Sequence, residues 1–194
     1  MQSSERSLID AGVERAIVVA LTAHAGQNRK GSTTPYVSHP LHVALCLQSL
    51  GMHVDVVQAG LLHDVVEDCD DWTLARLEAE FGPRVAAYVG ELTEDKGRSW
   101  EERKQGAVSK VPRMSAEAAT IKGADKLHNL STLVQALRAA AHPDEVWRHF
   151  SRGPEQTLQL AEQLVAALQP RLPAALASNL SAVLGELRAL IHGA

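Results

Sequence analysis

Four side chains that could do chemistry stand close together in the otherwise apolar segment AGLLHDVVED: His63, Asp64, Glu67 and Asp68. They form two pairs with a spacing of four residues, which places them on neighbouring strips of one face if the segment is helical. Burying three carboxylates beside an imidazole costs several kcal/mol per ion unless each is paired or coordinated. A metal ion would offset that cost. The alternative, a hydrogen-bonded cluster without metal, would need partners for all three carboxylates.

A second set of polar residues follows one face of a long helix predicted over 115–140: Lys122, Asp125, Asn129 and Thr132. Their spacing of three, four and three residues is that of a helix face. A further imidazole, His39, begins another predicted helix. The chain thus offers two imidazoles and two carboxylates as candidate ligands: His39, His63, Asp64 and Asp125. Such a mixed nitrogen and oxygen set suits Mn²⁺, Fe²⁺ or Zn²⁺ and leaves positions for water.

The elements that must position these residues are predicted to be helices. Apolar residues recur at intervals of three and four, whereas alternation of β-branched residues is almost absent, and this pattern predicts an all-α fold. Helices are predicted over 4–25, 40–51, 55–68, 72–81, 83–92, 115–140, 144–150, 154–169 and 173–192. The polar stretches 26–38 and about 94–113 are predicted to be loops.

The last of these helices carries a stripe of apolar residues: Leu172, Leu176, Leu180, Leu184, Leu187 and Ile191. We interpret this stripe as core packing, with the seam of a homodimer as the alternative.

The composition is that of an ordinary globular protein, with 194 residues, 45% hydrophobic and 22% charged. It predicts a single domain over 1–194 and excludes disordered and low-complexity classes. A net charge of −4 means that the chain has no excess of positive charge with which to bind the phosphate backbone of nucleic acid, so nucleic acid is not expected as a partner. No run of uncharged apolar residues reaches the length of about 18 that predicts a membrane span. Two cysteines are too few for a disulfide framework, and we expect a cytoplasmic protein.

Four segments occur in a recognisable order along the chain: AHAGQNRKG, TPYVSHPLHVA, AGLLHDVVED and IKGADKLHNL. Together they resemble the hydrolase domain of the RelA/SpoT homologues, within the HD phosphohydrolase superfamily. The chain looks most similar to the small stand-alone members of the metazoan SpoT homologue type. The resemblance covers about residues 13–150 and leaves the predicted helices over 154–192 as a segment packed on the matching part.

This resemblance implies a single HD-type helical bundle that hydrolyses the alarmones ppGpp and pppGpp to GDP or GTP and pyrophosphate. It implies one Mn²⁺ ion per chain, with Zn²⁺ or Fe²⁺ as alternatives, held by His39, His63, Asp64 and Asp125. Glu67 and Asp68 match the catalytic acidic pair of the family. The positions that match substrate-contacting residues are Arg29, Lys30, Asn129 and Thr132.

Two positions depart from the family pattern. Gly123 stands where a larger apolar residue is expected, and a glycine inside a helix costs about 1 kcal/mol relative to alanine. Ser131 stands where many relatives carry arginine, so a cation that could hold phosphate is missing. Neither departure touches a predicted metal ligand.

The residues also suggest roles that do not depend on the resemblance. A divalent ion would make water able to attack phosphorus, and Glu67 could orient that water or take its proton, while Asp68 could hold neighbouring groups. The sequence alone does not show which of these two residues has which role. Arg29 and Lys30 lie in a glycine-flanked loop before His39 and could bind phosphate.

Other residues and functions stay open at this point. Lys122 and Lys126 could reach phosphate, but lysines on a half-exposed helix are usually solvated, so neither is assigned to the site. We assign His24, His42 and His128 to packing or to support of the ligands, with a second metal as the alternative.

For function, the alternatives are a phosphatase acting on the 2′-phosphate of NADPH or on a nucleoside 5′-phosphate, and a nucleotide-binding module without catalysis. In each case the expected partner is a small-molecule nucleotide, without nucleic acid or membrane.

Overall fold

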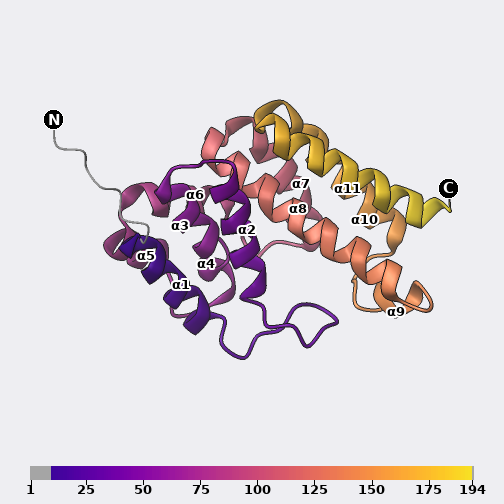
Figure 1. The fold of residues 1–194 in the computed structure, drawn as a ribbon, viewed down its shortest axis with the longest axis horizontal. Coiled ribbons are helices and arrows are strands. Elements are labelled where there is room, and N and C mark those ends of the chain that lie inside the picture. Colours follow the sequence, from indigo (N-terminus) through magenta and orange to yellow (C-terminus); the bar gives the residue numbers. More distant parts are fainter. Residues whose placement is uncertain (1–9, 194) are drawn as a thin grey trace.

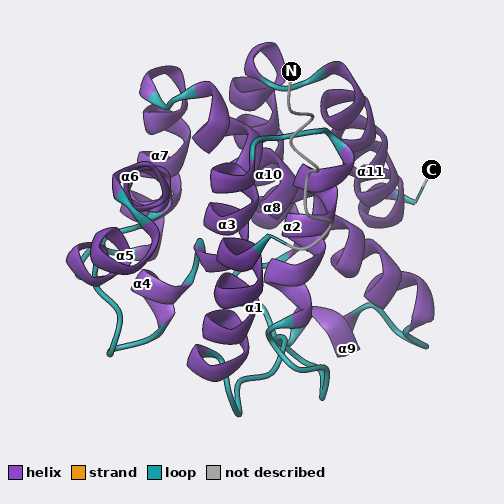
Figure 2. Cartoon of the chain, turned by 60° about the vertical axis from the view of Figure 1, so that its left-hand side comes forward, coloured by secondary structure: helices purple, strands orange, loops and turns teal. Residues whose placement is uncertain are grey.

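The long helix α8 (Ala116–Ala139) runs through the middle of the computed structural model, which describes residues 10–193 (Figure 1). It begins after Ser115, whose hydroxyl accepts a hydrogen bond from the backbone N–H of Ala118 and so caps the helix. Helices α1 to α6 lie on one side of α8, and α10 and α11 lie along the other side (Figure 1). Within residues 10–193 the chain forms helices and loops and no β-strand, which confirms the all-α prediction (Figure 2).

The other helices, in chain order, are α1 (Ala11–Ala23), α2 (Ser38–Ser49), α3 (Val54–Leu62), α4 (Val65–Asp68), α5 (Leu74–Phe81), α6 (Pro83–Leu92), α7 (Trp100–Lys110), the short 3-10 turn η1 (Val111–Arg113), α9 (Asp144–Trp147), α10 (Pro154–Leu168), the 3-10 turn η2 (Gln169–Arg171) and α11 (Ala174–His192).

Helix α3 is the centre of the first core cluster, and all of its residues from Val56 to Leu62 are buried. Helices α1, α2, α6 and α8 pack around it. At Gly60 a Cβ atom would lie 2.4 Å from Cδ1 of Leu47, so the glycine permits the close approach of α2. The sequence of α3 is apolar on every side because the helix has neighbours on every side.

The second core cluster lies between the C-terminal half of α8 and the helices α10 and α11. It contains Leu180, Leu184 and Leu187 of the predicted apolar stripe, and Leu172 and Ile191 pack against it, so the predicted core packing is confirmed. A Cβ atom on Gly123 would lie 2.8 Å from Leu172, which explains why glycine stands at this position of α8.

Helix α11 is long and apolar enough to cross a membrane by length and composition alone. Its charged residues are nevertheless paired with the neighbouring helices. Arg188 pairs with Glu162 of α10 at 2.6 Å, and Glu186 pairs with Arg138 of α8 at 2.9 Å. These pairs and the buried leucine stripe are what a helix of a bundle requires.

Several predicted boundaries agree with the structure within a few residues, and two predictions are wrong. The first concerns the helix predicted over 55–68, which is broken into α3 and α4 at His63 and Asp64. In a continuing helix the carbonyl of Gly60 would accept from the N–H of Asp64, but here it accepts a hydrogen bond of 2.8 Å from Nδ1 of His63. The side chain therefore competes with the backbone and ends the helix.

The second wrong prediction is the loop over 94–113, which contains α7 and η1. Ser99 and Glu102 form a capping box at the start of α7, in which each side chain accepts from the backbone N–H of the other. None of the residues of α7 is buried, so its sequence lacks the apolar stripe that periodicity detects. The helix is nevertheless held against α10.

Smaller differences occur at two other helices. The helix predicted over 4–25 begins at Ala11 after the N-cap Asp10, and its predicted residues 4–9 lie outside the described residues. Helix α9 ends at Trp147 and not at residue 150.

Candidate active site and metal centre

The break between α3 and α4 places His63 at the buried side of the candidate site. Its Nδ1 donates to the carbonyl of Gly60, which fixes the ring and leaves Nε2 without a proton in the neutral tautomer. This Nε2 atom is buried, and although Oδ2 of Asp64 lies 3.0 Å from it, the two do not form a hydrogen bond of regular geometry. A buried imidazole nitrogen that faces carboxylates and belongs to a ring of fixed orientation is what a metal-binding histidine provides.

Three ligand atoms converge at this point from different parts of the chain. His39 near the start of α2, His63 after α3 and Asp125 in the middle of α8 offer atoms that all lie within 4.8 Å of one another. Nε2 of His39 lies 3.3 Å from Oδ1 of Asp125. Two imidazole nitrogens and one carboxylate form a donor set that fits a divalent ion of the first transition row.

Asp64, the fourth predicted ligand, lies beside this group of three. Its Oδ2 atom is 3.0 Å from Nε2 of His63 and 3.7 Å from Nε2 of His39. The same oxygen accepts a hydrogen bond of 2.6 Å from the hydroxyl of Tyr36. The position of Asp64 agrees with a ligand role, which stays a prediction because the convergent group consists of the other three residues.

The charges in this cluster stabilise one another. Burial opposes a proton on His63, but the neighbouring carboxylates of Asp64 and Asp125 outweigh it and raise the pKa of His63 to about 9. Burial would raise the pKa of Asp64, but the adjacent His63 holds it below its ordinary value. A metal ion at this place must displace the proton of His63, so metal binding and proton release are coupled.

The predicted acidic pair lies on α4, directly after the break. Oε2 of Glu67 accepts a hydrogen bond of 3.2 Å from the backbone N–H of Glu94, and burial raises the pKa of the Glu67 carboxyl. Asp68 instead accepts from Lys96 at 2.8 Å and from Tyr36 at 3.4 Å. The Glu67 carboxyl, with its raised pKa, has the property that a proton acceptor near neutral pH requires, and Asp68 forms an ion pair with Lys96.

The predicted substrate-binding residues are linked to the predicted metal ligands through Asn129. Its side-chain oxygen accepts a hydrogen bond of 2.7 Å from Arg29, and its Nδ2 donates to Asp125 at 2.5 Å. Thr132 donates to the backbone carbonyl of Asn129 at 3.0 Å. Lys30 lies farther out, with its Nζ 4.5 Å from the ring centre of Phe150.

The loop that carries Arg29 and Lys30 is ordered by its own backbone. Arg29 donates to the carbonyl of Thr34, and Tyr36 donates to that of Gln27. Gly31 has a φ of 68°, and a Cβ atom there would lie 2.7 Å from the ring of His149. The glycine therefore lets the loop turn close to the segment after α9. The predicted loop over 26–38 is confirmed, except that Ser38 already begins α2.

Two of the remaining histidines support the ligands, as expected. The ring of His128 stacks on that of His42 with 4.6 Å between centres, and it also faces His39. The third, His24, is buried beside Tyr36, with 4.7 Å between ring centres. These contacts provide packing and hydrogen bonds around His39 and Tyr36.

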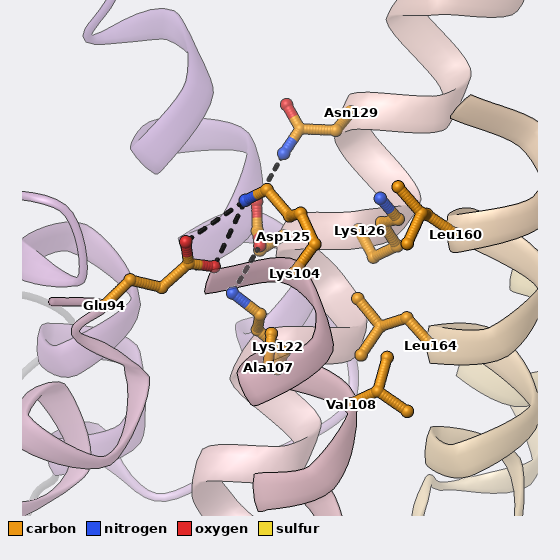
Figure 3. A pocket seen from close by; sticks show the side chains of 10 residues that line it. All are labelled: Glu94, Lys104, Ala107, Val108, Lys122, Asp125, Lys126, Asn129, Leu160 and Leu164. Carbon is orange, nitrogen blue, oxygen red and sulfur yellow. Dashed lines mark hydrogen bonds and ion pairs between the residues drawn. The ribbon is translucent and has the colours of Figure 1, made fainter. Parts of the chain in front are cut away.

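Sequence reasoning missed a group of cations on the other side of Asp125. A pocket of about 120 Å³ between α7, α8 and α10 contains the ammonium groups of Lys104, Lys122 and Lys126 (Figure 3). The prediction left Lys122 and Lys126 off the site because lysines on a half-exposed helix are usually solvated. Here α7 covers this face of α8, and the capping box at Ser99 was the signal that could have revealed that helix.

Comparisons with known proteins place the chain in a family. Residues 16–153 match the family described as HD domain. The guanosine-3′,5′-bis(diphosphate) 3′-pyrophosphohydrolase MESH1 of Homo sapiens is 44% identical over 153 residues, which cover 77% of this chain and 80% of that protein. The protein of the same name from Danio rerio is 43% identical over 117 residues, which cover 59% of this chain and 64% of that protein.

Two solved structures share the fold. One, described as a metazoan ortholog of SpoT that hydrolyzes ppGpp, has a TM-score of 0.78 at 30% identity and covers 94% of this chain and 98% of its own. The other, lmo0812 from Listeria monocytogenes EGD-e, has a TM-score of 0.70 at 34% identity and covers 80% of this chain and 99% of its own. Since residues 16–153, which are more than half of the chain, match this family, the chain belongs to the HD domain family.

Proposed function

We propose that this chain is a metal-dependent 3′-pyrophosphohydrolase of ppGpp and pppGpp, which produces GDP or GTP and pyrophosphate. The observation that carries the proposal is the convergence of His39, His63 and Asp125 beside Glu67, in a chain 44% identical to a hydrolase named for this reaction. The names of the relatives support this activity over a phosphatase acting on NADPH or on a nucleoside 5′-phosphate.

The reaction transfers the 3′-diphosphate (pyrophosphoryl) group of the substrate to water. The water oxygen forms a bond to the phosphorus that is attached to the ribose 3′-oxygen, and the bond between this phosphorus and the 3′-oxygen breaks. The proton that leaves the water ends on the 3′-oxygen. Pyrophosphate departs with the oxygen of the water, and GDP or GTP is the other product.

A divalent ion, when bound, polarises phosphoryl oxygens and makes water acidic enough to act near neutral pH. Glu67 takes the proton of the attacking water, since burial raises the pKa of its carboxyl toward the working pH. Tyr36 holds Asp64 and Asp68 in place through its hydroxyl, which donates to both carboxylates. Arg29 and Lys30 bind the anionic substrate from the loop before α2.

The metal we propose is Mn²⁺, with Zn²⁺ or Fe²⁺ as the ions to compare. Two imidazoles with carboxylates suit an ion between the oxygen-preferring Mg²⁺ and the sulfur-preferring soft metals. One ion per chain is expected, at His39, His63, Asp64 and Asp125. A cytoplasmic location is part of the proposal, and it is supported by Cys46 and Cys69, which are both free thiols.

The test is a substrate screen with purified protein. The protein is stripped with a chelator, reloaded with Mn²⁺, Zn²⁺ or Fe²⁺, and given ppGpp, NADPH and nucleoside 5′-phosphates while pyrophosphate and orthophosphate release are measured separately. We expect pyrophosphate release from ppGpp that disappears on chelation and returns with Mn²⁺. Full activity in chelator would contradict the metal requirement, and faster orthophosphate release from NADPH would contradict the proposed substrate.

A further inference from the structure

The pocket beside Asp125 carries more positive than negative charge. Lys104 extends from α7, Lys122 and Lys126 from α8, and the acidic groups in the wall are Glu94 and Asp125 (Figure 3). Both oxygens of Glu94 accept from Lys104 at 3.2 Å, and Lys122 lies 3.7 Å from Oδ2 of Asp125. Asp125 is also a predicted metal ligand, so its charge is shared with the metal centre.

Lys126 is the cation without a partner in this pocket. Among residues 10–193 its ammonium group forms neither a hydrogen bond nor an ion pair, and it lies beside the apolar side chain of Leu160 (Figure 3). Leu164 and Val108 extend the apolar wall. An ammonium group in such surroundings attracts an anion more strongly than one in water would.

Arg103 adds a further donor near the same place. Its guanidinium lies 3.9 Å from Glu67 and 3.8 Å from Glu94, and its Nε atom is buried without a hydrogen-bond partner. Buried donors without partners are rare in folded proteins and mark places where a ligand or water completes the network. Helix α7 thus presents two adjacent cationic side chains to the site.

The pocket extends along α8 from Lys122 to Asn129, the residue that Arg29 contacts. Along α8, Asn129 contacts Arg29 and comes one turn after Asp125, whereas Lys122 comes one turn before it. With a rise of 1.5 Å per residue, Lys122 and Asn129 are separated by roughly 10 Å along the helix axis. A substrate whose reacting phosphorus lies at Asp125 therefore meets the lysine pocket directly, because Asp125 is part of the pocket wall, and Asn129 connects this wall to Arg29.

We infer that the pocket formed by Lys104, Lys122 and Lys126 binds the pyrophosphate group that leaves the substrate. This inference rests on the proposed function, which supplies a diphosphate at the reacting position. A cavity of about 10–15 Å³ holds one water molecule, so a pocket of about 120 Å³ has room for a group of several heavy atoms. The aromatic rings of Tyr36 and Phe150 lie by Arg29 and Lys30, at the end that suits the nucleoside.

The experiment measures binding of inorganic pyrophosphate to the full-length protein by isothermal titration calorimetry. It is done with the metal-loaded protein and again after chelation, so that the contribution of the lysines is separated from that of the metal. We expect Lys126→Met and Lys104→Met each to weaken pyrophosphate binding by about tenfold or more in both forms, because each removes a charge-assisted contact to phosphate. Lys126→Arg, which keeps the charge, should retain most of the affinity.

The control is Lys110→Met, which removes an exposed ammonium from the same helix as Lys104 but outside the pocket. It should bind pyrophosphate like the parent. Thermal unfolding of each variant shows whether it is folded, and Lys104 is exposed enough for its replacement to be tolerated. Equal affinity of parent, Lys104→Met and Lys126→Met would overturn the inference.

A parallel titration with GDP distinguishes the two diphosphates of the substrate. The inference requires the lysine variants to lose affinity for pyrophosphate and to keep their affinity for GDP. Weaker binding of GDP alone would overturn it and would assign the pocket to the 5′-diphosphate. Hydrolysis of ppGpp by the parent is measured separately, so a parent without this activity but with lysine-dependent pyrophosphate binding would contradict only the proposed function.

Discussion

The Nδ1 atoms of His39 and His128 lie 2.7 Å apart, on helices α2 and α8. One of the two nitrogens must donate and the other accept. A histidine that binds metal through Nε2 carries its proton on Nδ1, so His39 is the donor and His128 the acceptor. Burial, and after it the neighbouring imidazoles of His39 and His42, lowers the pKa of His128 to about 4, which keeps this acceptor neutral at physiological pH.

The first prediction follows from this hydrogen bond. His128→Ala should weaken metal binding by about 10- to 100-fold, the usual effect of removing a group that orients a metal-bound histidine. His128→Asn, whose side-chain oxygen can accept the same hydrogen bond, should lose less. The measurement is metal affinity by competition with a chelating dye, and His53→Ala, at an exposed histidine, serves as the control. Unchanged affinity in His128→Ala would show that the contact does not orient His39.

The second prediction separates the metal ligands from the acidic pair. Asp125→Asn should lose bound metal and activity together, because it removes a charged ligand from the cluster. Glu67→Gln should keep the metal and lower kcat by about 10²- to 10⁴-fold, the usual scale for a positioned acid or base. Metal content is measured by elemental analysis on the same samples used for ppGpp hydrolysis. A Glu67→Gln variant as fast as the parent would remove Glu67 from the mechanism.

Most of the predicted metal ligands could be found from sequence, because they stand out from the residues around them. His63 and Asp64 interrupt an apolar helix, and Asp125 lies in a polar stripe with helical spacing. That His39 joins them could not be derived from periodicity, because contact between α2 and α8 is a property of the tertiary packing. Its place at the start of a predicted helix makes His39 a candidate ligand, and the resemblance to a known family implies that it joins the others.

The lysine pocket escaped prediction for a different reason. Lys126 directly follows Asp125, so it points about 100° away around α8 and leaves the predicted polar stripe. Whether that direction meets solvent or another helix depends on α7, which was predicted to be a loop. Helix α7 lacks buried residues, so only its capping box at Ser99 distinguished it from a loop.

The third prediction concerns the cations of the loop before α2. Replacing Arg29 and Lys30 together by alanine should lower kcat/KM for ppGpp by about 10- to 150-fold, since a charge-assisted contact to phosphate contributes about 1.5–3 kcal/mol. Added salt should weaken the parent more than the double variant, because screening acts on charges that the variant lacks. Steady-state hydrolysis at two ionic strengths measures both effects.

The matched control for this loop is Arg98→Ala, at an exposed arginine that pairs with Asp95. It should hydrolyse ppGpp like the parent at both ionic strengths. If the double variant also behaves like the parent, the loop does not hold the substrate, and the contact between Arg29 and Asn129 serves only to order the loop.

The fourth prediction uses the half-buried side chain of Lys126. Burial lowers the pKa of this group from 10.5 to about 8 in the folded protein. Between pH 8 and 10.5 the unfolded chain therefore binds a proton at this residue that the folded protein lacks, so Lys126 by itself makes the free energy of unfolding rise with pH in this window. His63 acts in the opposite direction up to about pH 9, because its pKa is raised to about 9 in the folded protein, so the contribution of Lys126 is measured as a difference between variant and parent. Above about pH 10 the opposite effect of Tyr36 sets in, because its pKa is raised by burial and by the carboxylate of Asp64.

The measurement is urea unfolding of the metal-free protein at pH 7.5 and pH 9.5. Removing the titrating group by Lys126→Met should make the change in unfolding free energy from pH 7.5 to pH 9.5 less favourable by about 1 to 2 kcal/mol than in the parent, in which the contribution of His63 is the same. Lys110→Met, on the exposed face of α7, should show the same change as the parent. An equal change in the parent and in Lys126→Met would mean that the ammonium keeps its ordinary pKa, as expected if water enters the pocket freely and hydrates the charge.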